Sequence, residues 1–413
     1  MVLTSANTYT GGTKLNAGTL AISNNAAFGT GTVSFVSNAT VASLTNLKIT
    51  NNYSVASGAT GAFDPNGFTL TNSGVISGSG AISLVDTGKL VLTSANTYTG
   101  GTTLYAGTLT ISNNTAMGTG TVAFASNATI ASLASLTVAN TFNIASNATA
   151  TVDVATNNTL TVSGAISGAG SLTKIDTGTL TLSGTNTYTG TTTIATNGGA
   201  ISLGTNGKLT ATANIVINSG GTLLLGGNNQ TTTNSALTLN GGTLSTGGGT
   251  TARAGTNSFS TLTLTANSTI DFSKLTGNTA LNFTNITAAY LNSNTLTITN
   301  WSGTEASGQV IGTNTTALID FAGLGSLNAT ELSHISFYGT NGAFLGTATF
   351  NGSLVQLVPV PEPAVVIAGG LLLGWLIFSR LPRLCQVKRG LSREGTDVIP
   401  NRDGTHDLEL VES

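Results

Sequence analysis

The chain has 413 residues, of which 7% are charged, and its formal net charge at pH 7 is −2. Typical domains carry roughly a quarter charged residues, and no basic stripe precedes residue 380, so we expect no nucleic-acid partner. The one cysteine, Cys385, leaves the body of the chain without disulfides or thiolate metal sites. Its 53 glycines are compatible with disorder, but Val, Leu and Ile recur regularly. Aromatic residues make up 6%, so we expect a narrow, aliphatic core.

The start of the chain already belongs to a repeat, because residues 2–12 return unchanged as residues 91–101. Neither a basic nor an apolar segment precedes them, so no secretory signal peptide is visible. Together with the export-type tail described below, this indicates a start placed too late, or a fragment. The alternative, a cytosolic protein, leaves that tail unexplained.

Two copies of one unit occupy residues 1–90 and 91–180. Leu3 aligns with Leu92 at a spacing of 89 residues, and one inserted residue later raises the spacing to 90. A third, shortened copy follows, and we predict degenerate coils of the same structure over residues 181–299.

Inside each unit, apolar residues alternate with polar ones, as in residues 108–111, 159–162 and 179–182. Such alternation indicates short strands with one buried face. Gly and Asn at 106–107 and 113–114 are typical of turns. Many short strands in a long repeat leave three fold classes, which are sandwich arrays, barrels and solenoids.

A right-handed parallel β-helix (β-solenoid) fits best, because Gly-Thr-Leu/Val phrases recur at gaps too irregular for sandwich domains. One unit would hold roughly four coils of ~20–25 residues. Thr and Asn would stack in ladders ~4.8 Å apart, where like charges would repel one another, and the few charges are expected to sit at turns. The predicted fold is therefore all-β, followed by a single C-terminal transmembrane helix.

The phrase Leu-Thr-x-x-Asn-Thr-Tyr-Thr-Gly-Gly-Thr, followed by Leu-x-x-Gly-Thr-Leu-x-Ile, occupies residues 3–22 and 92–111, with a degenerate copy from Leu182. It resembles the autotransporter-associated β-strand repeat of bacterial passenger domains. This resemblance implies a β-helical stalk displayed outside the cell. Autotransporters end in a membrane barrel, which we do not expect within these 413 residues.

From about residue 300 the aromatic content rises, and we interpret residues 300–357 as a cap over the end of the solenoid, because natural proteins cover such edges. Asn328 and Glu331 match a capping box before a short helix, and residues 335–339 are predicted to form a strand. The alternative is a small binding module.

Candidate catalytic groups are scarce, since residues 1–358 contain eight acidic and seven basic residues. Asp64 and Asp153 are repeat partners, as are Asp86 and Asp176, and recurring positions are more typical of turns than of catalysis. Calcium would need six to eight oxygens, and no Asp-rich motif is present. A lone His334 is typical of a satisfied surface residue.

We therefore nominate no catalytic, cofactor-binding or metal-binding residue, and we expect no cofactor. The alternative is a carbohydrate-active β-helix enzyme, a lyase or hydrolase, which needs clustered carboxylates or carboxylates with basic residues. Clustering of Asp271, Lys274 and Arg253 in a cleft would favour it.

The tail begins with an uncharged apolar run over residues 364–378, for which we predict a membrane helix spanning residues 364–381. Basic residues follow, so the C-terminal side is predicted to be cytoplasmic and the repeats to face outward. Residues 390–413 form a charged tail that we expect to be disordered.

A Pro-Glu-Pro tripeptide, an apolar helix and a basic cluster together resemble the PEP-CTERM sorting signal, here over residues 359–389. The matching residues are Pro361, Glu362, Pro363, Arg380 and Arg383. The resemblance implies recognition by an exosortase, a membrane protease, and removal of the tail.

The sequence thus predicts an exported, surface-displayed structural or adhesive protein of a bacterial envelope, anchored through residues 364–381 and released or re-anchored if the tail is cleaved. Its expected partners are the membrane, an exosortase, and extracellular polysaccharide or other cell surfaces.

Overall fold

The computed structural model describes residues 1–247, 255–273, 279–287, 291, 293–302, 317–321, 327–350 and 357–360. The chain divides into two compact units, Met1–Pro361 and Glu362–Ser413, and all described residues lie in the first. Among them, no helix has the length and apolar character to cross a membrane. The predicted membrane helix over 364–381 lies outside the described residues.

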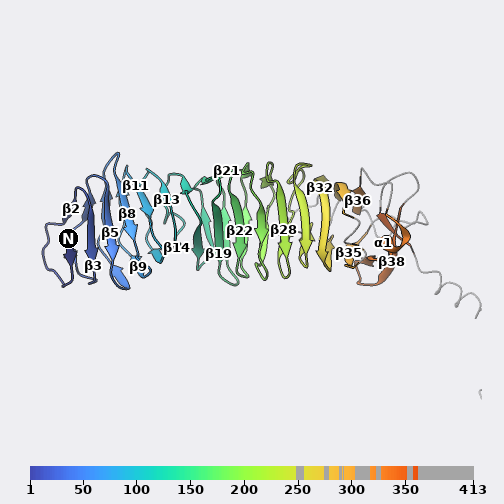
Figure 1. Ribbon diagram of the computed structural model, residues 1–413, viewed down its shortest axis with the longest axis horizontal. Coiled ribbons are helices and arrows are strands. Elements are labelled where there is room, and N and C mark those ends of the chain that lie inside the picture. Colours follow the sequence, from blue (N-terminus) through green and yellow to red (C-terminus); the bar gives the residue numbers. More distant parts are fainter. Residues whose placement is uncertain are drawn as a thin grey trace, which may run out of the picture. The chain divides into compact units, whose positions relative to one another are not determined.

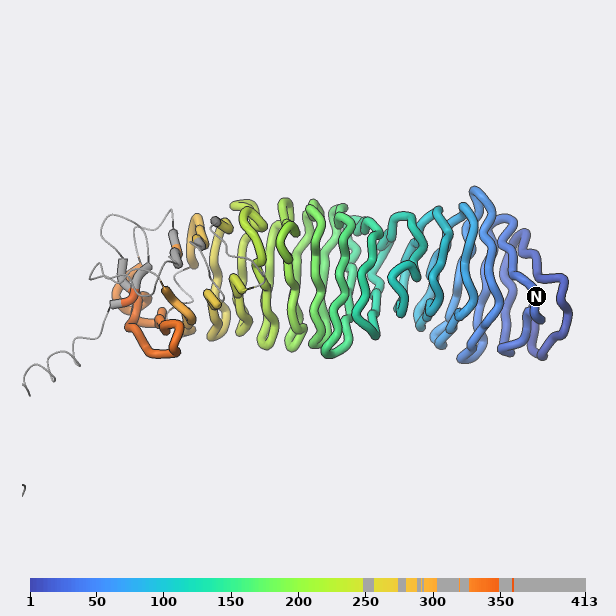
Figure 2. The backbone as a smooth tube through the Cα atoms, turned by 180° about the vertical axis from the view of Figure 1, so that it is seen from behind, coloured from blue at the N-terminus to red at the C-terminus, as the bar shows by residue number. Residues whose placement is uncertain are grey.

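The first unit is a stack of coils, which Figure 1 shows from the side and Figure 2 traces as one continuous winding from the N-terminus. Each coil passes through three faces, and each face consists of strands from one sheet or from two successive sheets. The first face consists of β1 (Val2–Leu3), β3 (Thr19–Ile22), β5 (Ala39–Ser43), β8 (Thr60–Asp64), β11 (Ala81–Leu84), β13 (Thr102–Leu104), β15 (Val122–Phe124), β18 (Phe142–Ile144) and β21 (Ile166–Gly168), with the short pair β24 (Thr185–Asn186) and β27 (Lys208–Leu209) following.

The second face is the longest sheet among the described residues. It consists of β6 (Leu47–Ile49), β9 (Thr69–Asn72), β12 (Lys89–Leu92), β14 (Thr108–Ile111), β16 (Ala128–Ser132), β19 (Thr149–Val154), β22 (Ser171–Ile175), β25 (Thr192–Ile194), β28 (Asn214–Asn218), β30 (Ala236–Asn240), β32 (Gly255–Ala266), β34 (Thr279–Ile286) and β36 (Ala317–Phe321).

The third face is built from two sheets in succession. The first contains β2 (Thr13–Leu15), β4 (Val33–Phe35), β7 (Tyr53–Val55) and β10 (Ile76–Gly78). The second contains β17 (Leu136–Val138), β20 (Thr159–Val162), β23 (Thr179–Leu182), β26 (Ala200–Ser202), β29 (Thr222–Leu224), β31 (Thr243–Ser245), β33 (Ser268–Asp271), β35 (Leu296–Trp301), β37 (Ile335–Gly339), β38 (Phe344–Phe350) and β39 (Leu357–Val360).

The predicted parallel β-solenoid is confirmed, because the described strand pairs from β1 to β37 are parallel. Its right-handedness stays a prediction. Val2 pairs with Ala21 and Ile144 with Gly168, so a coil takes between 19 and 24 residues in the first two repeats. This agrees with the expected coil length.

Corresponding strands of the three repeat copies lie on different faces. The strand after the Gly-Thr turn is β3 on the first face, β14 on the second and β26 on the third. A repeat of 89 or 90 residues therefore spans four coils plus one further face. Each copy is turned by one face relative to the previous copy.

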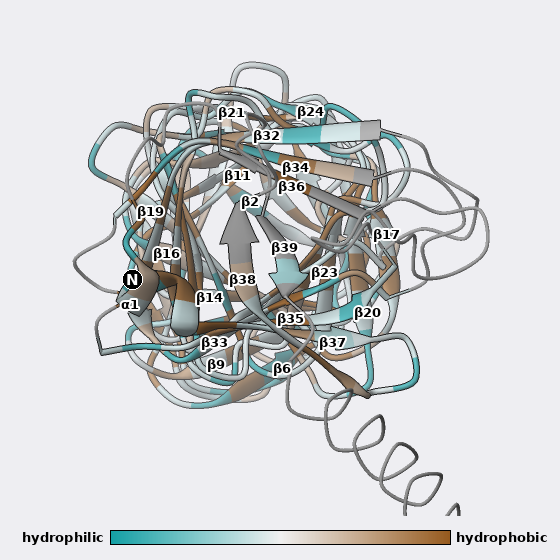
Figure 3. Ribbon diagram, turned by 90° about the vertical axis from the view of Figure 1, so that its right-hand side faces the viewer, coloured by the Kyte–Doolittle hydropathy of each residue, from teal (hydrophilic) through white to brown (hydrophobic). Residues whose placement is uncertain are grey.

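Inward and outward positions alternate along the strands, with Leu, Ile and Val inside and Thr outside, as in β20 and β23. Figure 3 shows the stack from its end, coloured by hydropathy. The expected aliphatic core needs correction, because the few aromatic side chains are concentrated inside. In the first repeat, Tyr53 lies 6.3, 6.0 and 5.3 Å from the rings of Phe28, Phe35 and Phe63.

The predicted polar ladders are present on the outside. Thr121 and Thr141 form a hydroxyl–hydroxyl hydrogen bond at 3.0 Å, and Asn240 donates to Asn218 at 2.8 Å. These pairs lie one coil apart, so neighbouring coils satisfy each other's side chains without charge.

The predicted capping box is also confirmed. Helix α1 (Ala329–Ser333) begins after Asn328, whose Oδ1 accepts from the N–H of Glu331 at 3.0 Å, while Glu331 Oε2 accepts from the N–H of Asn328 at 2.8 Å. The predicted strand over 335–339 is β37. After it, β38 and β39 pair antiparallel, so the parallel ladder ends there.

Candidate functional site

The asparagine of the repeat motif joins three successive coils. Asn96 Oδ1 accepts a hydrogen bond from the N–H of Ile76 at 2.7 Å, and its Nδ2 donates to the carbonyl of Ala116 at 2.6 Å. Asn186 forms the equivalent pair one copy later, at 2.9 Å each. Both side chains are buried. A buried amide must be paired, so this position stabilises the stacking of the coils.

The hydroxyl of each motif tyrosine forms a hydrogen bond with the threonine four residues later. The distances are 2.7 Å for Tyr9 and Thr13, 2.6 Å for Tyr98 and Thr102, and 2.5 Å for Tyr188 and Thr192. Tyr98 and Tyr188 are 0% exposed, and burial raises the pKa of both phenols. The later two motif copies therefore keep these groups neutral and inside the solenoid.

A second asparagine position holds the turn of the preceding coil. Asn140 Nδ2 donates to the carbonyls of Gly118 at 3.2 Å and Gly120 at 2.7 Å. Gly118 has a φ of +61°, and a Cβ there would lie 2.3 Å from the carbonyl oxygen of Tyr98. Only glycine fits this turn, so the Gly-rich phrase is required by the close approach of two coils.

Lys174 is a buried charge that the sequence analysis missed. Its position faces inward and is 0% exposed, and its Nζ donates to the carbonyls of Ile175 and Asp176 at 2.6 Å and of Gly198 at 3.1 Å. Burial lowers its pKa to about 8, against the attraction of Asp176 and Asp153. The expectation that the few charges sit at turns is therefore wrong here. The sequence could have indicated this, because the first copy has Leu84 at the position of Lys174, and an apolar residue there marks an inward position.

Of the paired acidic residues, Asp86 and Asp176 lie at turns as expected, but Asp64 is the last residue of β8 and Asp153 lies within β19, so the turn interpretation is wrong for that pair. Asp86 and Asp176 each accept a hydrogen bond at 2.6 Å from the backbone N–H of the following residue. Burial, with repulsion from those two aspartates, raises the pKa of Asp64 and Asp153 respectively. These two pairs lie on different faces, one repeat apart.

Asp271 is held in a hydrogen-bonded ladder. Its carboxylate accepts from Ser245 and Thr299, its neighbours in register, both at 3.1 Å. Asn300 at 2.6 Å and the N–H of Ser273 at 3.0 Å complete the set. Burial raises its pKa, but these hydrogen bonds outweigh burial and leave the pKa below its usual value. A carboxylate so fully engaged stabilises the ladder.

The cluster named as a test of the enzyme alternative is not fully described, since Arg253 and Lys274 lie outside the described residues. The residues nominated for the sorting signal also lie outside them, namely Pro361, Glu362, Pro363, Arg380 and Arg383. Among the described residues, no three His, Cys, Asp or Glu side chains converge as a metal site requires. His334 Nδ1 lies 2.9 Å from the carbonyl of Thr330 at the end of α1.

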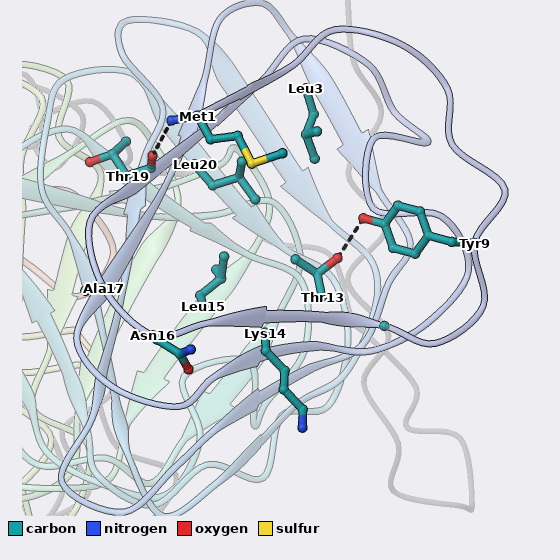
Figure 4. Close-up of a pocket in the computed structure, with 11 residues that line it drawn as sticks. Met1, Leu3, Tyr9, Thr13, Lys14, Leu15, Asn16, Ala17, Thr19 and Leu20 are labelled. Atoms are coloured by element: carbon teal, nitrogen blue, oxygen red, sulfur yellow. Dashed lines mark hydrogen bonds between the residues drawn. The ribbon is translucent and has the colours of Figure 1, made fainter.

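A concavity of about 480 Å³ lies at the first coil, and Figure 4 shows its lining. Leu3, Leu15 and Leu20 line it, with Tyr9 at one side. Tyr9 is 39% exposed, whereas in the later copies the tyrosine is buried between coils. This concavity is therefore the end surface of the stack.

The segments that contain the repeat motif are the ones that match a known protein family. Residues 1–22, 85–111 and 172–203 match the Passenger-associated-transport-repeat family. The matched segments contain the three Asn–Tyr–Thr motifs described above, which supports the resemblance to autotransporter-associated β-strand repeats. Searches of curated proteins and of solved structures give no match.

Proposed function

We propose that this chain is an exported, surface-displayed structural or adhesive protein of a bacterial envelope, and that the solenoid is its stalk. The observation that carries the proposal is that the residues of the matched repeat motif hold the coils of the solenoid together. Its Asn, Tyr and Thr side chains are engaged in coil-to-coil packing, and the three segments that carry it match a passenger-associated transport repeat. Uncharged Thr and Asn ladders cover the outside.

We also propose that the tail directs this display. Pro361, Glu362 and Pro363 would be recognised by an exosortase, while Arg380 and Arg383 would keep the C-terminal side in the cytoplasm. The helix over 364–381 would hold the protein in the membrane until the tail is removed.

The test expresses the gene, with its upstream sequence, in its bacterial host and treats intact cells with protease. Peptides from residues 1–247 are expected to be released from intact cells, and protection of all of them would refute display. Mass spectrometry of the surface-exposed protein then tests the tail. If peptides containing Trp375 persist in it, removal of the tail is wrong, although display stands.

A further inference from the structure

A shallow groove of about 430 Å³ crosses the outside of the first face, from the first repeat into the start of the second. It runs over β3, β5, β8, β11 and β13, which are consecutive neighbours in the sheet (Figure 1). Its lining residues are Gly18, Thr19, Asn38, Ala39, Thr40, Thr60, Ala62, Ser83, Val85 and Tyr105. Its volume lies within the range of small-molecule sites.

The floor of the groove is a row of small side chains in register, three of which carry hydroxyl groups, with Ser83 only 4% exposed. Thr19 pairs with Thr40, Thr40 with Ala62 and Ala62 with Ser83. Successive positions lie ~4.8 Å apart, so the row presents its side chains at regular intervals along the groove. The small Ala62 side chain hollows the middle of the row.

One wall carries the only aromatic side chain of the lining, Tyr105, which is 51% exposed. It follows β13 directly, beside Val85 one coil earlier. At the opposite side, Asn38 Oδ1 accepts from the N–H of Thr60 at 2.8 Å. That hydrogen bond fixes the orientation of the Asn38 amide. Among the described residues, no acceptor pairs with its Nδ2, which is therefore available as a donor to a ligand.

We propose that this groove binds a neutral polysaccharide, which stacks a sugar ring on Tyr105 and exchanges hydrogen bonds with the hydroxyl row. The lining contains no Asp, Glu, Lys, Arg or His, so nothing there compensates a charged ligand. An amphipathic ring beside neutral donors and acceptors suits a sugar, which has an apolar face and a polar rim. The proposal adds a ligand to the displayed stalk proposed above. It rests on that proposed function only in assuming that binding takes place at the cell surface.

The equivalent row one repeat further along the chain supplies an internal control. It consists of Thr108, Thr129, Thr151 and Thr173, and it lies on the second face in the same register. The position of Tyr105 is occupied there by Ala195, and that of Ala62 by Thr151. The second row thus has the hydroxyls without the aromatic wall or the hollow.

Affinity electrophoresis of the purified full chain tests the proposal, with polysaccharide cast in native gels. The probes are laminarin and dextran, which are neutral, and polygalacturonate, which is anionic. At least one neutral glycan is expected to retard the protein, and Tyr105→Ala should weaken that binding by about tenfold or more. Tyr105→Phe, which keeps the ring, should stay within about threefold of the unsubstituted protein.

Tyr9→Ala removes another exposed tyrosine outside the groove and should leave the retardation unchanged. In the Tyr105→Ala background, Ala195→Tyr with Thr151→Ala should restore part of it from the second face. The proposal is overturned if no neutral glycan retards the protein, if only polygalacturonate does, or if Tyr105→Ala has no effect. Self-association that Tyr105→Ala abolishes would instead assign the groove to a second copy of the chain. Because the purified protein is used, failure of surface display in cells would not alter this result.

Discussion

Removing one phenol oxygen should have opposite effects at two buried tyrosines. Tyr53 is 1% exposed, and among the described residues no hydrogen-bond partner lies near its Oη. The Oη of Tyr98 bonds to Thr102 at 2.6 Å. Tyr53→Phe therefore removes an unpaired polar atom, whereas Tyr98→Phe leaves the buried Thr102 hydroxyl without its partner.

The magnitudes follow from the cost of a buried, unpaired polar group, about 1–3 kcal/mol. Tyr53→Phe should raise the free energy of unfolding by about 1 kcal/mol, because the small void left by the oxygen offsets part of the gain. Tyr98→Phe should lower it by about 1–2 kcal/mol. The second repeat already carries Phe142 at the position of Tyr53, and the reverse change, Phe142→Tyr, should be destabilising.

Urea unfolding followed by circular dichroism measures the difference, provided that the slope of free energy against urea is unchanged. Because solenoids can unfold locally, hydrogen exchange of amides in β7 and β13 gives a second, local measurement. Tyr9→Phe is the matched control, since its bond to Thr13 is similar but the side chain is 39% exposed; its effect should be below about 0.5 kcal/mol. Equal signs for Tyr53→Phe and Tyr98→Phe would refute the reasoning.

Three further predictions concern the same packing. Lys174 has a folded-state pKa of about 8 against an ordinary value of 10.5, so the unfolded chain binds more protons between these values; stability should rise with pH across this window, and Lys174→Met should abolish the rise in urea titrations. Gly118→Ala should destabilise by about 1–3 kcal/mol more than Gly58→Ala, because both glycines have positive φ but only Gly118 is crowded; equal melting temperatures would contradict this. Asn140→Ala should lower the free energy of unfolding by about 2–4 kcal/mol, because the carbonyls of Gly118 and Gly120 lose their buried donor. Asn52 is exposed, so Asn52→Ala should cost less. Similar unfolding midpoints for the two variants would show that Asn140 does not hold the turn.

The strands, the turns and the capping box could be predicted because each depends on local spacing. Alternation of period two marks a strand, and Asn328 with Glu331 marks a helix start. The rotation of the copies could not be predicted, because it depends on how a repeat of 89 or 90 residues divides into coils of 19 to 24. A change of one residue per coil accumulates over the four coils and displaces the next copy around the stack.

Two individual side chains, the buried Lys174 and the groove residue Tyr105, were missed for a related reason. Lys174 and Tyr105 are each the exception at a repeated position, where the first copy has Leu84 and Asn16. A search for motifs shared by the copies does not detect positions at which one copy differs from the others. The motif residues, which a sequence comparison selects first, proved to be the ones engaged inside the fold.

The rotation also explains which positions the copies share. An inward residue meets the same environment on every face, because each face packs against one continuous core, so Asn96 and Tyr98 have direct counterparts in the third copy. An outward residue is carried to a different side of the stalk in each copy. Tyr105, on the first face, is replaced by Ala195 on the second. Packing therefore keeps most inward positions of the copies alike, with Lys174 in place of Leu84 as an exception, while a ligand of the proposed kind can select the outside of one copy and leave the others as plain polar ladders.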